Sequence, residues 1–63
     1  MATDAETYFK AMASGNHATC IRIEERHGLY GYPPEIVSVG LNAVAEGKDA
    51  HEAIEAYMQE SQQ

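Results

Sequence analysis

The segment from Pro34 to Glu46 is apolar around most of a helical circumference, and this feature constrains the fold more than any other. Polar side chains occupy only one stripe of such a helix, roughly 80° wide, and they are Glu35, Ser38, Asn42 and Glu46. A helix with so narrow a polar stripe is buried on more than one side. The sequence therefore predicts a central helix that other elements must cover.

The rest of the chain has few large apolar side chains with which to cover this helix. Only 10 of the 63 residues are Leu, Ile, Val or Phe, and ten alanines make up much of the remaining apolar content. A domain of about 60 residues is marginally stable even with an ordinary core. We therefore expect a second copy of the chain to complete the core, so that the protein is a homodimer.

Capping residues and glycines divide the chain into short helical segments. Thr3 with Glu6, and Asp49 with Glu52, have the spacing of capping boxes, which mark helix starts. Together with the central segment they predict helices over about 4–14, 34–46 and 50–60. The predicted fold class is mainly α: a single small helical domain over 1–63, built as a bundle of three to four short helices and completed by dimerisation.

The outer helices each have one apolar stripe to bury. In both segments the apolar residues recur at three- and four-residue steps. In the first helix the stripe consists of Ala5, Tyr8, Phe9, Met12 and Ala13, and in the last it consists of Ala50, Ala53, Ile54, Tyr57 and Met58.

Residues 17–27 fit either a helix or a strand. Asn16 is a suitable helix cap, but the apolar residues of this segment scatter around a helical wheel. As a strand, the segment would place the β-branched residues Thr19, Ile21 and Ile23 on one face. Such a strand would have to pair with a second molecule. We keep both alternatives, with the helix as the first.

The strand alternative matches a known architecture. Residues 33–58, which include Pro-Pro-Glu-Ile-Val and Ala-Glu-Gly-Lys-Asp-Ala-His-Glu-Ala-Ile, resemble the helical half of ribbon-helix-helix proteins. Proteins of that family pair their strands in obligate dimers and read DNA. The resemblance implies a strand-helix-helix dimer and a DNA-binding regulator as the alternative fold and function. The sequence departs from the family at the outward strand positions, which would be Cys20, Arg22 and Glu24.

The charge of the chain makes nucleic acid an unlikely partner. Ten Asp and Glu against four Lys and Arg give a formal net charge of −6, so there is no basic field for phosphates. Asp49, Glu52 and Glu55 would form an acidic face on the last helix, attracted to basic surfaces. A competitor for basic nucleic-acid-binding surfaces is therefore a further alternative function.

The sequence predicts no catalytic site, no cofactor and no established metal site. There is no phosphate-binding glycine loop, no H-E-x-x-H motif and no cysteine pair. In a helix, His17, Cys20 and His27 would share a face with Glu24, but His27 would lie about 15 Å along the axis from His17. Whether His17, Cys20 and His27 bind a metal stays open, and we expect a non-enzymatic protein.

Cysteine content and hydropathy indicate the compartment. Cys20 is the only cysteine, so no intramolecular disulfide is possible, which fits a reducing environment. Apolar runs are too short to span a bilayer, and no signal peptide is expected at the N-terminus. We expect a cytoplasmic protein with no membrane partner.

These observations predict a small acidic protein–protein interaction module that acts as a regulator or inhibitor by binding another protein. Gly40 and Ala43 make a flat patch on the central helix that a second backbone could approach closely. The predicted interface includes that helix and the loop before it: Leu29, Tyr30, Tyr32, Ile36, Val37, Gly40, Leu41 and Val44.

Overall fold

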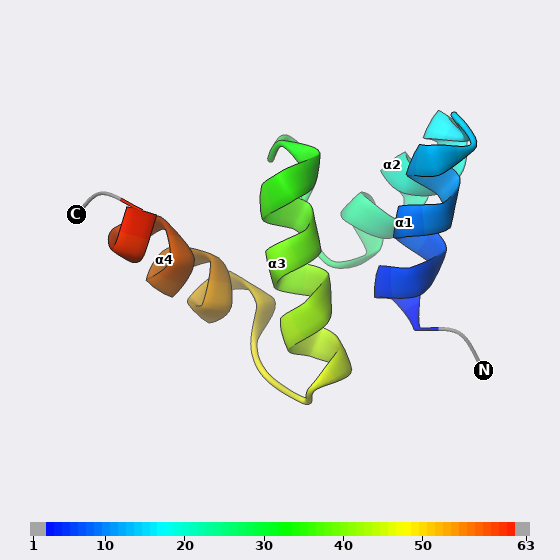
Figure 1. Ribbon diagram of the computed structural model, residues 1–63. Coiled ribbons are helices and arrows are strands. Elements are labelled where there is room, and N and C mark those ends of the chain that lie inside the picture. The colour runs from blue at the N-terminus through cyan, green and yellow to red at the C-terminus, as the bar shows by residue number, and fades with distance from the viewer. Residues whose placement is uncertain (1–2, 62–63) are drawn as a thin grey trace.

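The computed structural model describes residues 3–61 and contains four helices in that range (Figure 1). They are α1 (Asp4–Ala13), α2 (His17–Arg26), α3 (Pro34–Ala45) and α4 (Ala50–Ser61). No strand is present between residues 3 and 61. The mainly α fold class predicted from the sequence is therefore confirmed.

Side chains cap three of the four helices at their first turn. The Glu6 amide donates to Thr3 Oγ1 at 3.2 Å, and the Glu52 amide donates to Asp49 Oδ1 at 3.0 Å. Asn16 caps α2 by accepting from the amide of residue 19 at 3.3 Å. Helix α3 begins instead with Pro34, whose fixed φ suits a first helical position and which has no amide to satisfy.

Residues 17–26 form a helix, which is the first of the two alternatives predicted for this segment. Ile23 is 3% exposed and Ile21 is 42% exposed, so two residues that a strand would place on one face lie on different faces of α2. Cys20 and Ile23, three residues apart, form the buried side. The structure thus has a helix where the ribbon-helix-helix arrangement needs a strand.

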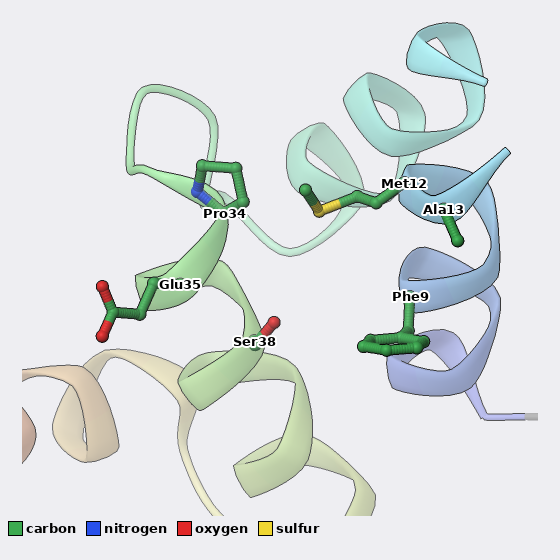
Figure 2. A pocket seen from close by; sticks show the side chains of 6 residues that line it. All are labelled: Phe9, Met12, Ala13, Pro34, Glu35 and Ser38. Carbon is green, nitrogen blue, oxygen red and sulfur yellow. The ribbon is translucent and has the colours of Figure 1, made fainter. Parts of the chain in front are cut away.

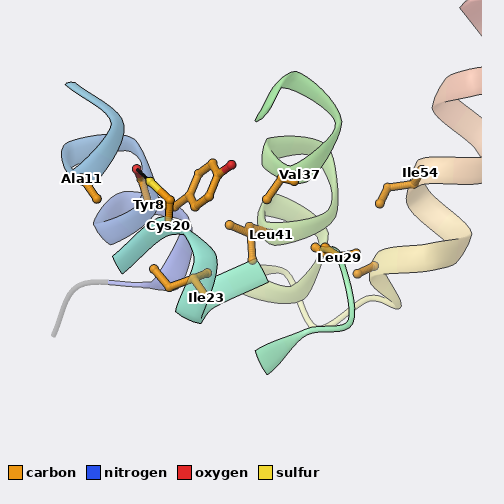
Figure 3. Close-up of a cluster of buried hydrophobic side chains, with 9 residues drawn as sticks. Tyr8, Ala11, Cys20, Ile23, Leu29, Val37, Leu41 and Ile54 are labelled. Carbon is orange, nitrogen blue, oxygen red and sulfur yellow. Dashed lines mark hydrogen bonds between the residues drawn. The ribbon is translucent and has the colours of Figure 1, made fainter. Parts of the chain in front are cut away.

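Helix α3 lies at the centre, with α1 and α2 on one side and α4 on the other (Figure 1). Helices of the same chain therefore pack against α3 on two sides. From the sequence, a second copy of the chain is expected to supply part of this packing. The buried cluster joins all four helices and the loop before α3 (Figure 3). It consists of Tyr8, Ala11, Cys20, Ile23, Leu29, Val37, Leu41, Ala50 and Ile54.

The turn after α2 places Leu29 in this core. Gly28 has φ +68°, a conformation that glycine adopts without steric cost. The Leu29 amide then donates to the Glu24 carbonyl at 2.7 Å, and the Gly28 amide donates to the Glu25 carbonyl at 3.2 Å, the hydrogen bonds of a Schellman motif. Leu29 is fully buried as a result.

Gly40 is closely approached by neighbouring side chains, and these neighbours belong to the same chain. A Cβ atom at Gly40 would lie 3.0 Å from Leu29 Cδ1, 3.1 Å from Ile54 Cδ1 and 3.4 Å from Ala50 Cβ. The flat patch predicted as a contact for a second chain is therefore occupied by α4 and by the loop before α3.

Candidate protein-binding groove

Large apolar side chains are exposed on one side of the molecule, where α1 faces the start of α3. A hollow of about 400 Å³ lies between them and is open to solvent. Figure 2 shows Phe9 and Met12 extending from α1 toward Pro34 and Ser38 of α3. The remaining lining residues are Ala13 and Glu35. Phe9 is 73% exposed, so the largest side chain of the hollow has little cover.

A second hollow of about 200 Å³ adjoins the first on the side of α2. Both hollows include Met12 and Pro34 in their lining, so they adjoin at these two residues, and we call the two hollows together the apolar groove. The second hollow is lined by Tyr8, Met12, His17, Cys20, Ile21, Glu24 and Pro34.

The groove exists because the apolar residues of α1 cover a wider arc than one neighbour can bury. Tyr8 and Phe9 are consecutive and therefore point about 100° apart on the helix. Tyr8 and Ala11 face the core, while Phe9, Met12 and Ala13 lie on the adjoining face. The prediction of a single buried stripe on α1 is therefore wrong for Phe9, Met12 and Ala13.

A hydrogen bond at the inner wall of the second hollow orients a carboxylate. The hydroxyl of Tyr8 donates to Glu24 Oε2 at 2.7 Å, although Tyr8 itself is only 1% exposed. Burial, and next the hydrogen bond to Glu24, raise the pKa of Tyr8 above its ordinary value of 10.0. The hydroxyl therefore remains a donor across the neutral range and holds Glu24 in place.

Cys20 contributes its thiol to the same wall but is not poised for reaction. Its Sγ atom is buried, 4.0 Å from the carbonyl oxygen of Tyr8. Burial, followed by the nearby charge of Glu24, raises the pKa of the thiol above its ordinary value of 9.0. At neutral pH the side chain is therefore the protonated thiol, which is a poor nucleophile and a poor metal ligand.

The structure does not bring His17, Cys20 and His27 together. Among the described residues, no three His, Cys, Asp or Glu side chains are placed to hold a metal ion. His27 instead pairs with Asp4, at 2.7 Å between Nε2 and Oδ2, and Arg26 lies 3.4 Å from the same oxygen. The hydrogen bond with His27, aided by the charge of Arg26, outweighs partial burial and lowers the pKa of Asp4. This cluster joins the start of α1 to the end of α2.

Half of the eight predicted interface residues lie inside the single chain. Four of them are buried in its core: Leu29, Val37, Gly40 and Leu41. Tyr32 and Ile36 are half-buried. Only Tyr30 and Val44 are exposed, at 66% and 37%, so a second chain could contact them without opening the fold. An interface at these two residues stays a prediction.

The predicted acidic face does not belong to the lining of the groove. Asp49, Glu52 and Glu55 are all exposed at or on α4, which packs on the opposite side of α3 from α1 and α2 (Figure 1). Glu35, which belongs to the groove lining, turns its carboxylate toward α4 and accepts a hydrogen bond from Tyr57 at 2.9 Å.

Comparison with known proteins gives no match: no family model, no curated protein and no solved structure is similar to this chain. Within residues 3–61, none of the helices has the length and apolar content needed to cross a bilayer.

Proposed function

We propose that the chain is a small acidic, non-enzymatic interaction module of the cytoplasm, and that it regulates or inhibits another protein by binding it through the apolar groove. The observation that carries the proposal is the exposure of Phe9 in a hollow shared with Met12 and Pro34. Phe9 and Met12 are exposed side by side, and such neighbouring apolar side chains are better candidates for an interaction site than apolar residues scattered singly. Aromatic residues, Phe included, are also enriched at protein–protein interfaces.

The free energy available from the groove is moderate. Full burial of a Phe, Met or Ile side chain is worth about 1.5–3 kcal/mol. Phe9, Met12 and Ile21 are 73%, 44% and 42% exposed, so covering all three contributes about 2–5 kcal/mol. A dissociation constant of about 1 μM needs about 8 kcal/mol. The partner must therefore also make contacts beyond these three side chains.

Site-specific photocrosslinking tests the proposal. A benzophenone side chain is placed at position 9 or, as a control, at Met58, which is 42% exposed on α4. In cells that produce the protein, we expect an adduct with another protein from position 9 only. That protein, once purified, should bind the wild type and Met58→Ser equally and Phe9→Ser at least about tenfold more weakly. Equal binding by Phe9→Ser would refute the proposal.

The homodimer is a separate proposal, supported by the exposed Tyr30 and Val44. Each chain has a net charge of −6, so two copies repel each other, and salt should strengthen their association by screening. Sedimentation equilibrium at low and high salt measures this directly. A mass of 6.9 kDa at both salt concentrations would exclude the dimer.

Competition for a basic nucleic-acid-binding surface is an alternative that the exposed Glu52 and Glu55 support. In that case the double variant Glu52→Lys, Glu55→Lys should lose binding to the partner, because its acidic face is reversed, while Phe9→Ser should bind normally. The opposite pattern supports the groove.

A further inference from the structure

We infer that the partner binds the groove with a basic amphipathic helix, which places apolar side chains in the two hollows and a Lys or Arg against Glu24. This inference rests on the proposed function, since it concerns the chemistry of the segment that the groove accepts.

The acidic residues that line the groove are not matched by basic ones in its lining. Its lining includes two carboxylates, those of Glu24 and Glu35, and no Lys or Arg. His17 also lines the second hollow. Glu35 turns toward α4, where Tyr57 donates to it. Glu24 is thus the carboxylate that a bound segment meets directly.

Glu24 is already oriented for a cation before any partner binds. It is half-buried, and the Tyr8 hydroxyl holds its Oε2 atom at 2.7 Å. Because Tyr8 is fixed in the core, binding need not immobilise a freely rotating carboxylate, which lowers the entropy cost of forming a pair. Partial burial also protects such a pair from screening by salt.

The same position penalises a purely apolar partner. A segment that fills the second hollow removes water from Glu24 and leaves the carboxylate with the neutral Tyr8 hydroxyl as its hydrogen-bond donor. Burying a charge without an opposite charge is costly. A Lys or Arg next to the apolar side chains removes that cost. A second copy of this chain is disfavoured as the occupant, because it brings a further net charge of −6.

The surroundings of the groove favour a helix as the bound segment. Its walls are helices α1, α2 and α3, and the described part of the chain has no sheet edge to which an extended segment could add. A channel between packed helices accepts the apolar face of another helix, with anchors three and four residues apart.

Two designed helical peptides provide the probe. Both carry leucine at the a and d positions of a heptad repeat, and their remaining positions are lysine in one peptide and glutamate in the other. Titration calorimetry should show saturable binding of the lysine peptide and none of the glutamate peptide. Phe9→Ser should weaken the lysine peptide about tenfold, and Met58→Ser should not.

Paired charge variants test the contact with Glu24. Glu24→Gln retains an acceptor for the Tyr8 hydroxyl, while Glu25→Gln removes the same charge from the neighbouring exposed residue, which lines neither hollow. We expect the dissociation constant to rise about fivefold for Glu24→Gln and to change little for Glu25→Gln. Equal effects would overturn the assignment of Glu24.

The remaining outcomes separate this inference from the proposed function. If both peptides bind equally and Phe9→Ser weakens both, the groove binds apolar segments but the basic partner is excluded. If Phe9→Ser leaves binding of the lysine peptide unchanged, the groove is not the binding site and both proposals fail. Absence of saturable binding by the lysine peptide also overturns the inference.

Discussion

Substitution of Gly40 by alanine tests how tightly α3 packs against the elements that cover it. Two opposing contributions to the free energy of unfolding decide the result. Alanine in a helix interior is favoured over glycine by about 1 kcal/mol. Against this, the new Cβ would lie 3.0 Å from Leu29 Cδ1 and 3.1 Å from Ile54 Cδ1, both closer than the optimal carbon–carbon separation of about 3.5–4.0 Å.

Neither neighbour can move away into solvent. Leu29 is 0% exposed and Ile54 is 2% exposed, and the third neighbour, Ala50 Cβ, moves only with α4. Overpacking of this kind costs about 1–3 kcal/mol. We therefore expect Gly40→Ala to destabilise the fold by about 1 kcal/mol overall, which lowers the melting temperature of a domain this small by about 4–8 °C. Gly40→Leu should leave the chain unfolded, since a domain of this length has only about 3–9 kcal/mol of stability.

Urea denaturation followed by circular dichroism measures the effect, and a double-mutant cycle isolates its cause. Ile54→Val removes the Cδ1 atom that the new Cβ would contact. In the Ile54→Val background, Gly40→Ala should therefore be less destabilising than in the wild type. A gain of about 1 kcal/mol from Gly40→Ala in the wild type, equal to the helix propensity alone, would show instead that α3 has room for a methyl group at this point.

Four further predictions concern individual side chains. Tyr8→Phe removes the hydroxyl that donates to Glu24 and should cost about 1–2 kcal/mol in urea denaturation; an unchanged midpoint would contradict this. The folded state raises the pKa of Tyr8 above 10.0 and that of Cys20 above 9.0. Both groups therefore contribute stability that is fully present below pH 9 and is lost as the pH rises. The urea concentration at the unfolding midpoint should fall in alkaline solution, and it should fall less steeply in Tyr8→Phe. The pKa of Asp4 is lowered instead, so the stability that Asp4 contributes is present above pH 3.8 and is lost on acidification. Asp4→Asn should therefore reduce the loss of helical signal when an acid titration is followed by circular dichroism. The buried thiol of Cys20 should react with an alkylating reagent only as fast as the fold opens, so a rate that urea does not change would contradict its burial.

The helices of this fold could be predicted from the sequence because their ends are marked by local chemistry. Thr3, Asn16 and Asp49 each accept an amide hydrogen bond at the first turn of a helix. Such caps act over three residues and do not depend on the rest of the fold. The segment from 17 to 26 was ambiguous because its β-branched residues favour a strand, and packing of Cys20 and Ile23 against the core outweighs that preference.

The groove and the cover of α3 could not be predicted in the same way. Hydrophobic periodicity indicates how many faces of a helix are buried, but not whether the cover comes from the same chain or from another. From the sequence, the space beside Gly40 could be occupied by the same chain or by a second one. In the structure, Leu29 and Ile54 of the same chain occupy it. The exposure of Phe9 follows from the angle between it and Tyr8, but only once Tyr8 is known to face the core.

The turn that places Leu29 in the core has a consequence for how the molecule folds and for where it tolerates change. The connection between α2 and α3 is itself part of the packed interior, since Leu29 is fully buried and lies against Gly40. The pair α1–α2 and the pair α3–α4 therefore both depend on the packing of Leu29, and we expect them to unfold in one transition. An insertion beside the exposed Gly47 should leave the fold intact. The same insertion beside Gly28 should remove Leu29 from the core and unfold both helix pairs.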